Sequence, residues 1–142
     1  MWITLEGNIG SGKTTLFDLM QFEKKFQSWV FVKEPVDQWS QARMDLAGQS
    51  MLDKFYESPA KHGPFFQTYA LSTRLGLLNP IVPLMKDAVI VSERSPESDA
   101  NIFAPLMSMT PFEKACYTSI YENLCQHLAD VVVYLKTDPD IC

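Results

Sequence analysis

The residues best suited to chemistry form one short stretch near the N-terminus, Gly-Asn-Ile-Gly-Ser-Gly-Lys-Thr-Thr. It fits the pattern G-x-x-x-x-G-K-[ST], in which glycines let successive backbone N–H groups point at an anion. Lys13 adds an ammonium for the outer phosphates, and Thr14 offers a hydroxyl to Mg²⁺. An ordinary glycine-rich turn is the alternative, but a strand before the stretch and a helix after it are both predicted. The sequence therefore predicts a nucleoside-triphosphate site at Gly7, Asn8, Ile9, Gly10, Ser11, Gly12, Lys13, Thr14 and Thr15.

Two acids, Glu34 and Glu93, each follow a short apolar segment. In a parallel α/β sheet, ligands bind beyond the carboxyl ends of the strands. Phosphoryl transfer needs a metal ligand, a group that receives the acceptor proton, and positive charge on the transferring group. We assign Thr14 and Glu93 to the metal, Glu34 to the proton, and Lys13 with Arg94 to the charge. The two glutamates could exchange roles, and each alone could be a solvated strand end.

The elements that must position these residues are four short apolar segments, predicted as strands over 2–5, 29–32, 88–91 and 131–135. Their nearly continuous apolar character is typical of strands covered on both faces. The stretches between them are long enough for helices, which indicates an α/β fold with a parallel sheet. We expect strand 2–5 in the centre and strand 88–91 beside it, because the glycine-rich stretch 7–15, which we call the phosphate loop, must share a metal with Glu93.

Four helices are predicted, one from residue 13 or 14 onward and three over 41–56, 65–78 and 110–128. Gly63-Pro64 should open the third, and Thr110-Pro111-Phe112-Glu113 forms a capping box that opens the last. Every fourth residue of the last helix is apolar along one face: Phe112, Cys116, Ile120, Leu124 and Leu128. Tyr117 and Tyr121 form a second stripe. We expect the aromatic stripe in the core, with a dimer face as the alternative.

Composition limits the class of protein. The chain has 142 residues, 46% of them hydrophobic, which is enough for one domain with one core. Its net charge of −5 shows no basic surface for nucleic acid. No targeting segment and no apolar run of membrane-spanning length is present, so we expect no membrane partner and a soluble, cytoplasmic protein. The three cysteines match neither a disulfide framework nor a metal site.

Four motifs in order resemble the deoxynucleoside kinases, and most closely their deoxycytidine/deoxyguanosine kinase branch. They are Glu-Gly-Asn-Ile-Gly-Ser-Gly-Lys-Thr-Thr (6–15), Glu-Pro-Val-x-x-Trp (34–39), Phe-Gln-x-Tyr (66–69) and Glu-Arg-Ser-x-x-Ser-Asp-x-x-Ile-Phe (93–103). The resemblance implies a three-layer fold of the P-loop NTPase type, with four of the family's five strands. It also implies phosphorylation of a deoxynucleoside 5′-hydroxyl by ATP or another nucleoside triphosphate with Mg²⁺, and a homodimer formed through helices.

By motif position, the resemblance implies that Glu34 holds the 5′-hydroxyl with Arg94 beside it, while Glu93 lies near the metal. Tyr56 would bond the sugar 3′-hydroxyl, and Gln67 would read the base edge. Other side chains would surround the base or line its far end: Trp39, Leu52, Phe55, Phe66, Ala70, Arg74, Asp99 and Phe103.

The match breaks at the C-terminal end, where residues 104–142 contain no arginine and nothing resembles the family's arginine-rich lid. We therefore expect a single kinase domain over 1–142 that is C-terminally incomplete, and no useful turnover from these residues alone. The alternatives are a thymidine- or thymidylate-type kinase and a non-catalytic nucleotide-binding fragment.

The end of the implied base pocket bears on specificity. Arg74 lies seven residues, about two helical turns, after Gln67, so both side chains share one helix face. The resemblance lets Asp99 meet Arg74 there. A carboxylate accepts hydrogen bonds from an exocyclic amino group, which thymine lacks, and the guanidinium would fill the space of the thymine methyl group. We expect deoxycytidine or purine deoxynucleosides to be preferred over thymidine.

Overall fold

A computed structural model of the chain describes residues 1–43 and 46–142. Their packing divides them into two compact units. Unit 1 comprises Met1–Glu34, Leu77–Ser95 and His127–Cys142, and unit 2 comprises Pro35–Gly76 and Pro96–Gln126. The single domain expected from the sequence stays a prediction. No helix in the described part of the chain combines the length and the apolar character needed to span a membrane.

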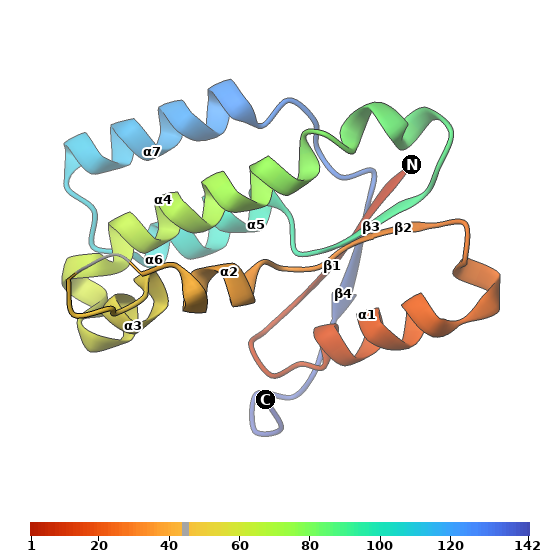
Figure 1. Cartoon of the computed structure of the whole chain (residues 1–142), viewed down its shortest axis with the longest axis horizontal. Coiled ribbons are helices and arrows are strands. Elements are labelled where there is room, and N and C mark those ends of the chain that lie inside the picture. The colour runs from red at the N-terminus through yellow and green to blue at the C-terminus, as the bar shows by residue number, and fades with distance from the viewer. Residues whose placement is uncertain (44–45) are drawn as a thin grey trace. The chain divides into compact units, whose positions relative to one another are not determined.

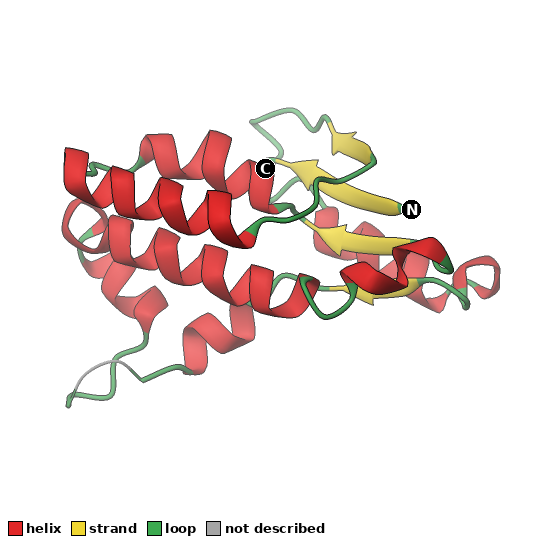
Figure 2. Ribbon diagram, turned by 90° about the horizontal axis from the view of Figure 1, so that it is seen from above, coloured by secondary structure: helices red, strands yellow, loops and turns green. Residues whose placement is uncertain are grey.

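Unit 1 contains a four-stranded sheet in the order β2-β3-β1-β4, with every neighbouring pair parallel (Figure 2). Its strands are β1 (Trp2–Gly7), β2 (Val30–Val32), β3 (Ile90–Glu93) and β4 (Val131–Leu135). All four predicted strands are present, and the predicted α/β fold with a parallel sheet is confirmed. The central place of β1, with β3 beside it, is confirmed as well.

Strands β1 and β3 are buried on both faces, as their apolar character predicted, whereas the same prediction is wrong for the edge strand β4, whose residues 131–134 are exposed. Alternate side chains of a strand point to opposite faces. On one face Leu5 and Val91 pack against Phe17 of helix α1 (Lys13–Phe22), and on the other Trp2 and Ile90 form a second cluster. Two short 3₁₀ helices, η1 (Lys24–Phe26) and η2 (Val82–Lys86), complete the unit.

Unit 2 is helical. Its elements are α2 (Val36–Gln41), α3 (Met51–Glu57), α4 (Pro59–Leu78, whose last two residues belong to unit 1), α5 (Pro96–Ser98), the π-helical turn η3 (Asp99–Phe103), α6 (Ala104–Leu106) and α7 (Pro111–Leu124). Helices α4 and α7 run side by side (Figure 1). Leu71 and Leu75 of α4 form the core with Ala104 and with Tyr117 of α7.

The predicted helix over 41–56 is wrong in its first part. Ala42 is extended, Gly48 has φ 77°, and Arg43 forms an antiparallel bridge with Ser50. The helix α3 begins only after Ser50, whose side chain accepts from the Asp53 backbone N–H in a capping box. That Ser-x-x-Asp signal was present in the sequence. Residue 44, part of the predicted apolar pattern, lies outside the described residues.

Helix α4 begins at Pro59, six residues before the predicted start at 65, and continues through Pro64. Proline removes only one backbone hydrogen bond, and here it falls close to the N-terminal end of the helix. The Ser58 carbonyl accepts from His62 at 2.9 Å, so the first turn forms ahead of the proline. The predicted end before Asn79 is confirmed.

Helix α7 has the predicted capping box at Thr110 and Glu113, but it ends at Leu124, four residues before the predicted end. The face predicted from the four-residue repeat is also wrong, because Phe112 and Leu124 are exposed. Steps of four residues rotate by about 40° around a helix of 3.6 residues per turn, so such a repeat drifts off one face. The tyrosine stripe is the buried one, as expected, since Tyr117 and Tyr121 pack in the core.

We expect Leu71→Ala to destabilise the protein by roughly 2–5 kcal/mol, because Leu71 is fully buried and its truncation leaves a cavity. Leu106→Ala is the matched control, since Leu106 is 73% exposed and should change stability by less than about 0.5 kcal/mol. Urea unfolding of both variants measures the free energies. Equal losses would contradict the assignment of Leu71 to the core.

The capping box of α7 predicts a pH effect. Hydrogen bonds from the Thr110 backbone and side chain lower the pKa of Glu113 from its ordinary 4.5. A carboxylate whose folded pKa is depressed stabilises the protein above its unfolded pKa, and the contribution is lost as pH falls through the folded value. We expect Glu113→Gln to lower the urea midpoint at pH 7 and to match wild type near pH 2. If the urea midpoints of Glu113→Gln and wild type differed equally at both pH values, the predicted pH effect would be contradicted. Glu122→Gln on the same helix is the control.

Candidate active site

The phosphate loop of unit 1 connects β1 to α1 with a backbone that glycine alone adopts readily. Gly7, Gly10 and Gly12 have φ values of 149°, 80° and 88°. A Cβ atom on Gly7 would lie 2.7 Å from Ser11 Oγ and 2.8 Å from the Leu135 carbonyl oxygen, so the loop closes on itself there. Gly12 is the N-cap of α1, and the positive end of the helix dipole therefore faces the loop.

Lys13 reaches back across this loop. Its Nζ donates to the Gly7 carbonyl at 3.0 Å and to the Asn8 carbonyl at 2.6 Å, and the residue is buried. Burial lowers the pKa of Lys13, with repulsion from Arg94 adding to the effect, while nearby glutamates oppose it. The ammonium is thus held inside the loop by two backbone carbonyl groups.

Glu93 and Thr14 meet at the carboxyl edge of the sheet. The parallel register pairs Leu5 of β1 with Glu93 of β3, so Glu93 ends its strand beside the start of the phosphate loop. The Thr14 hydroxyl donates to Glu93 Oε1. Only 4% of Glu93 is exposed, so its carboxylate is held inside the site rather than in solvent. The predicted pair of metal-ligand candidates is therefore in direct contact.

Arg94 adopts the left-handed backbone region with φ 65°, the one non-glycine residue with positive φ in the part of the chain that is described. Such a conformation costs about 1–3 kcal/mol and clusters at functional sites. Its backbone N–H donates to the Leu5 carbonyl at 3.0 Å, and Nη1 donates to the Gly7 carbonyl at 3.2 Å. Its Nε lies 3.4 Å from Glu34 Oε1, so the predicted base and the predicted cation form an ion pair.

The residues at this edge fit a magnesium ion. Mg²⁺ takes oxygen ligands and commonly uses one or two protein groups together with phosphate oxygens and water. The adjoining Thr14 hydroxyl and Glu93 carboxylate provide such a pair. Within residues 1–43 and 46–142 no group of three or more His, Cys, Asp or Glu side chains forms a metal cage. Thr14 and Glu93 are therefore the two side chains at this edge that could hold the ion.

Unit 2 contains a second polar cluster, buried among helices. Arg74 Nε donates to Asp99 Oδ2 at 2.6 Å, and Gln67 Nε2 lies 3.3 Å from Asp99 Oδ1. All three residues are at most 3% exposed. Gln67 and Arg74 share one face of α4, as their two-turn spacing predicted, and Asp99 meets Arg74, as the resemblance implied. The contact of Asp99 with Gln67 was not predicted. A buried ion pair of this kind is costly to desolvate, which is a reason to look for its use in function.

Aromatic rings adjoin this cluster in the same unit. The Arg74 guanidinium lies 5.9 Å from the Trp39 ring, and Trp39 contacts Phe66 edge to face at 5.5 Å. Phe66 stacks on Phe55 at 4.6 Å between centroids, and Tyr56 lies 5.4 Å from Phe55. Four of the predicted substrate-site rings, from α2, α3 and α4, therefore form one continuous group.

The remaining predicted residues of unit 2 lie on the same elements. Ala70 is buried on α4 between Gln67 and Arg74 in sequence, whereas Leu52 on α3 and Phe103 on η3 are half-buried. Sequence reasoning assigned Tyr117 to the core without giving it a polar role. Burial raises the pKa of the Tyr117 hydroxyl, and the negative charge of Asp99 raises it further, whereas the side chain of Gln67 lowers it. Two residues of the polar cluster therefore interact with this hydroxyl.

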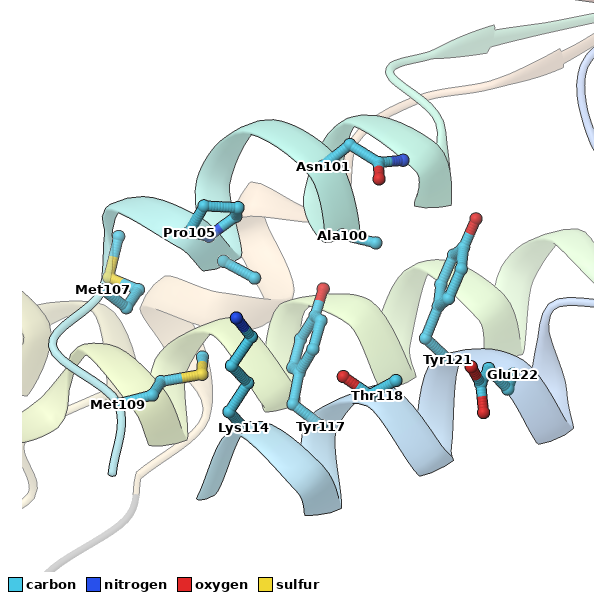
Figure 3. Close-up of a pocket in the computed structure, with 11 residues that line it drawn as sticks. Ala100, Asn101, Pro105, Met107, Met109, Lys114, Tyr117, Thr118, Tyr121 and Glu122 are labelled. Atoms are coloured by element: carbon cyan, nitrogen blue, oxygen red, sulfur yellow. The ribbon is translucent and has the colours of Figure 1, made fainter. Parts of the chain in front are cut away.

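Unit 2 also contains a cavity of about 430 Å³ between the segment 100–109 and α7 (Figure 3). Lys114, Tyr117 and Tyr121 extend toward it from α7, and Asn101 lies on its opposite wall (Figure 3). Burial raises the pKa of Tyr121 to about 12. None of the predicted substrate residues lines this cavity, so it is a separate feature of the helical unit.

Comparison with known proteins gives a consistent result. The "Probable deoxycytidine kinase" of Fowlpox virus is 31% identical over 99% of this chain and 57% of its own length. Deoxycytidine kinase 2 of Gallus gallus and deoxycytidine kinase of Homo sapiens are each 29% identical, over 61% and 62% of their lengths. The chain thus spans about three fifths of these relatives. Residues 3–142 match the deoxynucleoside kinase family along nearly the whole chain, and the chain therefore belongs to that family.

Proposed function

We propose that the protein containing this chain transfers the γ-phosphoryl group of ATP, or of another nucleoside triphosphate, to the 5′-hydroxyl of a deoxynucleoside. Membership of the deoxynucleoside kinase family supports the reaction class. One observation carries the proposal. Thr14 contacts Glu93, and the Glu34–Arg94 ion pair lies at the carboxyl edge of the same sheet, so candidate metal ligands, base and cation occur in one unit.

In this proposal Glu34 accepts the proton of the 5′-hydroxyl as the hydroxyl oxygen bonds to the γ-phosphorus. The bond between that phosphorus and the β–γ bridging oxygen breaks, and the nucleoside diphosphate leaves. The Arg94 guanidinium, whose Nε lies 3.4 Å from that carboxylate, orients it and also faces the developing negative charge. Lys13 exchanges its carbonyl partners in the loop for phosphate oxygens, which are stronger acceptors. Positioning and charge stabilisation of this kind account for most of the catalysis of phosphoryl transfer.

Thr14 and Glu93 would hold Mg²⁺ together with the nucleotide phosphates. The ion would neutralise phosphate charge and polarise the phosphorus–oxygen bond. Since Glu93 receives a hydrogen bond from Thr14, the two ligands are already adjacent and need little rearrangement. Should Glu93 be the base instead, Glu34 would serve to hold the 5′-hydroxyl.

The Gln67–Arg74–Asp99 cluster would select the base. Asp99 accepts hydrogen bonds from both partners, and a cytosine or purine amino group can donate to it in place of the Gln67 amide. Thymine has no such donor, so a thymine that displaced the Gln67 amide would leave the hydrogen bond from Gln67 to Asp99 unreplaced. The adjoining rings of Trp39, Phe55 and Phe66 offer apolar faces to a planar base.

The rival interpretations gain less support. Deoxycytidine kinases, rather than thymidine- or thymidylate-type kinases, are the named relatives. A non-catalytic nucleotide-binding role would not require a buried strand-end acid in contact with the loop threonine, or an arginine in a costly backbone conformation next to a second acid.

The substrate panel tests both reaction and specificity in the protein encoded by the complete reading frame that contains this chain. We expect 5′-monophosphates from deoxycytidine or purine deoxynucleosides, with thymidine disfavoured, because an unpaired buried acceptor costs about 1–3 kcal/mol, or roughly 5- to 150-fold in kcat/KM. The Arg74→Met, Asp99→Ala double variant should gain thymidine activity relative to wild type.

Arg43→Met is the control for the double variant. Arg43 is an exposed arginine of the same unit, and its Nη1 lies 3.8 Å from Asp53 Oδ2. A wild type that prefers thymidine would refute the role of Arg74 and Asp99 in specificity. A double variant with no gain in thymidine activity would refute it as well. Absence of phosphorylation with every deoxynucleoside would refute the function itself.

Substitution of the two acids separates their roles. Glu34→Gln removes the proton acceptor and keeps the shape, so we expect kcat to fall by about 10²-fold or more. Glu93→Gln should instead weaken the binding of Mg²⁺, seen as a higher magnesium concentration for half-maximal rate. Glu23→Gln, an exposed acid of the same unit, is the control. Near-normal kcat in Glu34→Gln would transfer the role of base to Glu93.

A further inference from the structure

A chain of buried hydrogen bonds begins at Trp2 and ends at the backbone of Arg94. The Trp2 indole Nε1 donates to Ser92 Oγ at 2.8 Å, and Ser92 Oγ donates to the Arg94 carbonyl at 2.9 Å. Trp2 and Ser92 are each 1% exposed, so water does not compete for either bond. We propose that Trp2 and Ser92 are positioning residues that hold Arg94, and through it Glu34, in the geometry for phosphoryl transfer. This inference rests on the proposed function.

The direction of the two bonds follows from the chemistry of the donors. An indole N–H can only donate, so the Ser92 oxygen must accept from Trp2. The hydroxyl proton of Ser92 is then available for a different acceptor, and the Arg94 carbonyl lies in reach. Trp2 starts β1 and Ser92 lies on the adjacent β3, so the sheet register brings the indole to the hydroxyl. All of these residues belong to unit 1.

Arg94 needs such support because its backbone is in the left-handed region, with φ 65°. A non-glycine residue stays there only when its surroundings hold it. Its N–H is anchored on the Leu5 carbonyl at 3.0 Å, and the Ser92 hydroxyl anchors its carbonyl on the other side. With both peptide groups fixed, the side chain is directed to Gly7 and Glu34. Loss of the Ser92 bond would free one anchor and favour relaxation of Arg94 toward right-handed angles.

A purely structural role makes a different prediction. Ser92 could serve only to satisfy the Trp2 indole inside the sheet, and its loss would then lower stability without changing the chemistry. A positioning role predicts a fall in kcat with an unchanged KM for ATP, because ATP is held mainly by the phosphate loop. A fall in kcat at an unchanged KM for ATP therefore indicates a positioning role, and a loss of stability at an unchanged kcat indicates a purely structural one.

The experiment uses Ser92→Ala and Trp2→Phe in the protein from the complete reading frame. Each removes one bond of the chain, and we expect kcat to fall by about 5- to 10-fold. The double variant should be little worse than Ser92→Ala, since both changes break one chain. Ser92→Thr, which keeps the hydroxyl, should retain the wild-type kcat. Val91→Ala is the matched control, because Val91 is a fully buried neighbour on β3 whose truncation lowers the melting temperature outside the chain of bonds.

A second readout does not depend on activity. In ¹⁵N-labelled protein, the Trp2 indole N–H should exchange with solvent about 10-fold faster in Ser92→Ala, and the Arg94 Nε–H signal should shift, whereas Val91→Ala changes neither. The inference is overturned if Ser92→Ala lowers stability like Val91→Ala but leaves kcat and the Arg94 signal unchanged. If wild type phosphorylates no deoxynucleoside, the proposed function fails, and the Arg94 signal still decides whether Ser92 positions this residue.

Discussion

The parallel pairing of β1 with β3 is the constraint on which the candidate active site depends. Its register sets Leu5 opposite Glu93, so the chain enters the phosphate loop from one strand beside the acid that ends the other. A shift of one residue would turn Glu93 to the opposite face and separate it from Thr14. Because both strands are buried on both faces, apolar packing around Leu5, Val91 and Phe17 resists that shift.

Polar groups in this site are satisfied largely by the backbone. Lys13 bonds to loop carbonyls, and Arg94 bonds to the Gly7 carbonyl, whose residue cannot carry a side chain without meeting Ser11 and Leu135. The same glycine thus supplies an acceptor to two cations and permits close packing of β4. Removing one cation would leave the other with altered partners, which makes the loop, Lys13 and Arg94 one electrostatic unit.

The helical unit, unit 2, contains a buried ion pair between Arg74 and Asp99. Asp99 and Arg74 are removed from water almost completely, and the pair is retained although apolar residues would often be as stable. Gln67 and the Trp39 ring complete the surroundings of the pair. In the proposed function, this cluster would favour a base whose own donor replaces that of Gln67.

The sequence by itself determined the parts whose chemistry is local. The phosphate loop follows from glycine, lysine and threonine spacing, and the parallel sheet follows from short, continuously apolar segments separated by stretches long enough for helices. The capping box at Thr110 and Glu113 was predicted for the same reason, since its partners lie three residues apart. The resemblance to a kinase family added the base-site residues, among them Gln67 and Arg74. Their seven-residue spacing places them on one helix face.

Only the tertiary structure decided the rest. The buried face of α7 depends on which side meets Leu71 and Leu75. Periodicity does not identify that face, because a four-residue repeat and a helix of 3.6 residues per turn diverge. The contact of Trp2 with Ser92, ninety residues apart in sequence, arises from strand pairing alone. Long-range register, rather than local propensity, decides which polar side chains meet inside a sheet.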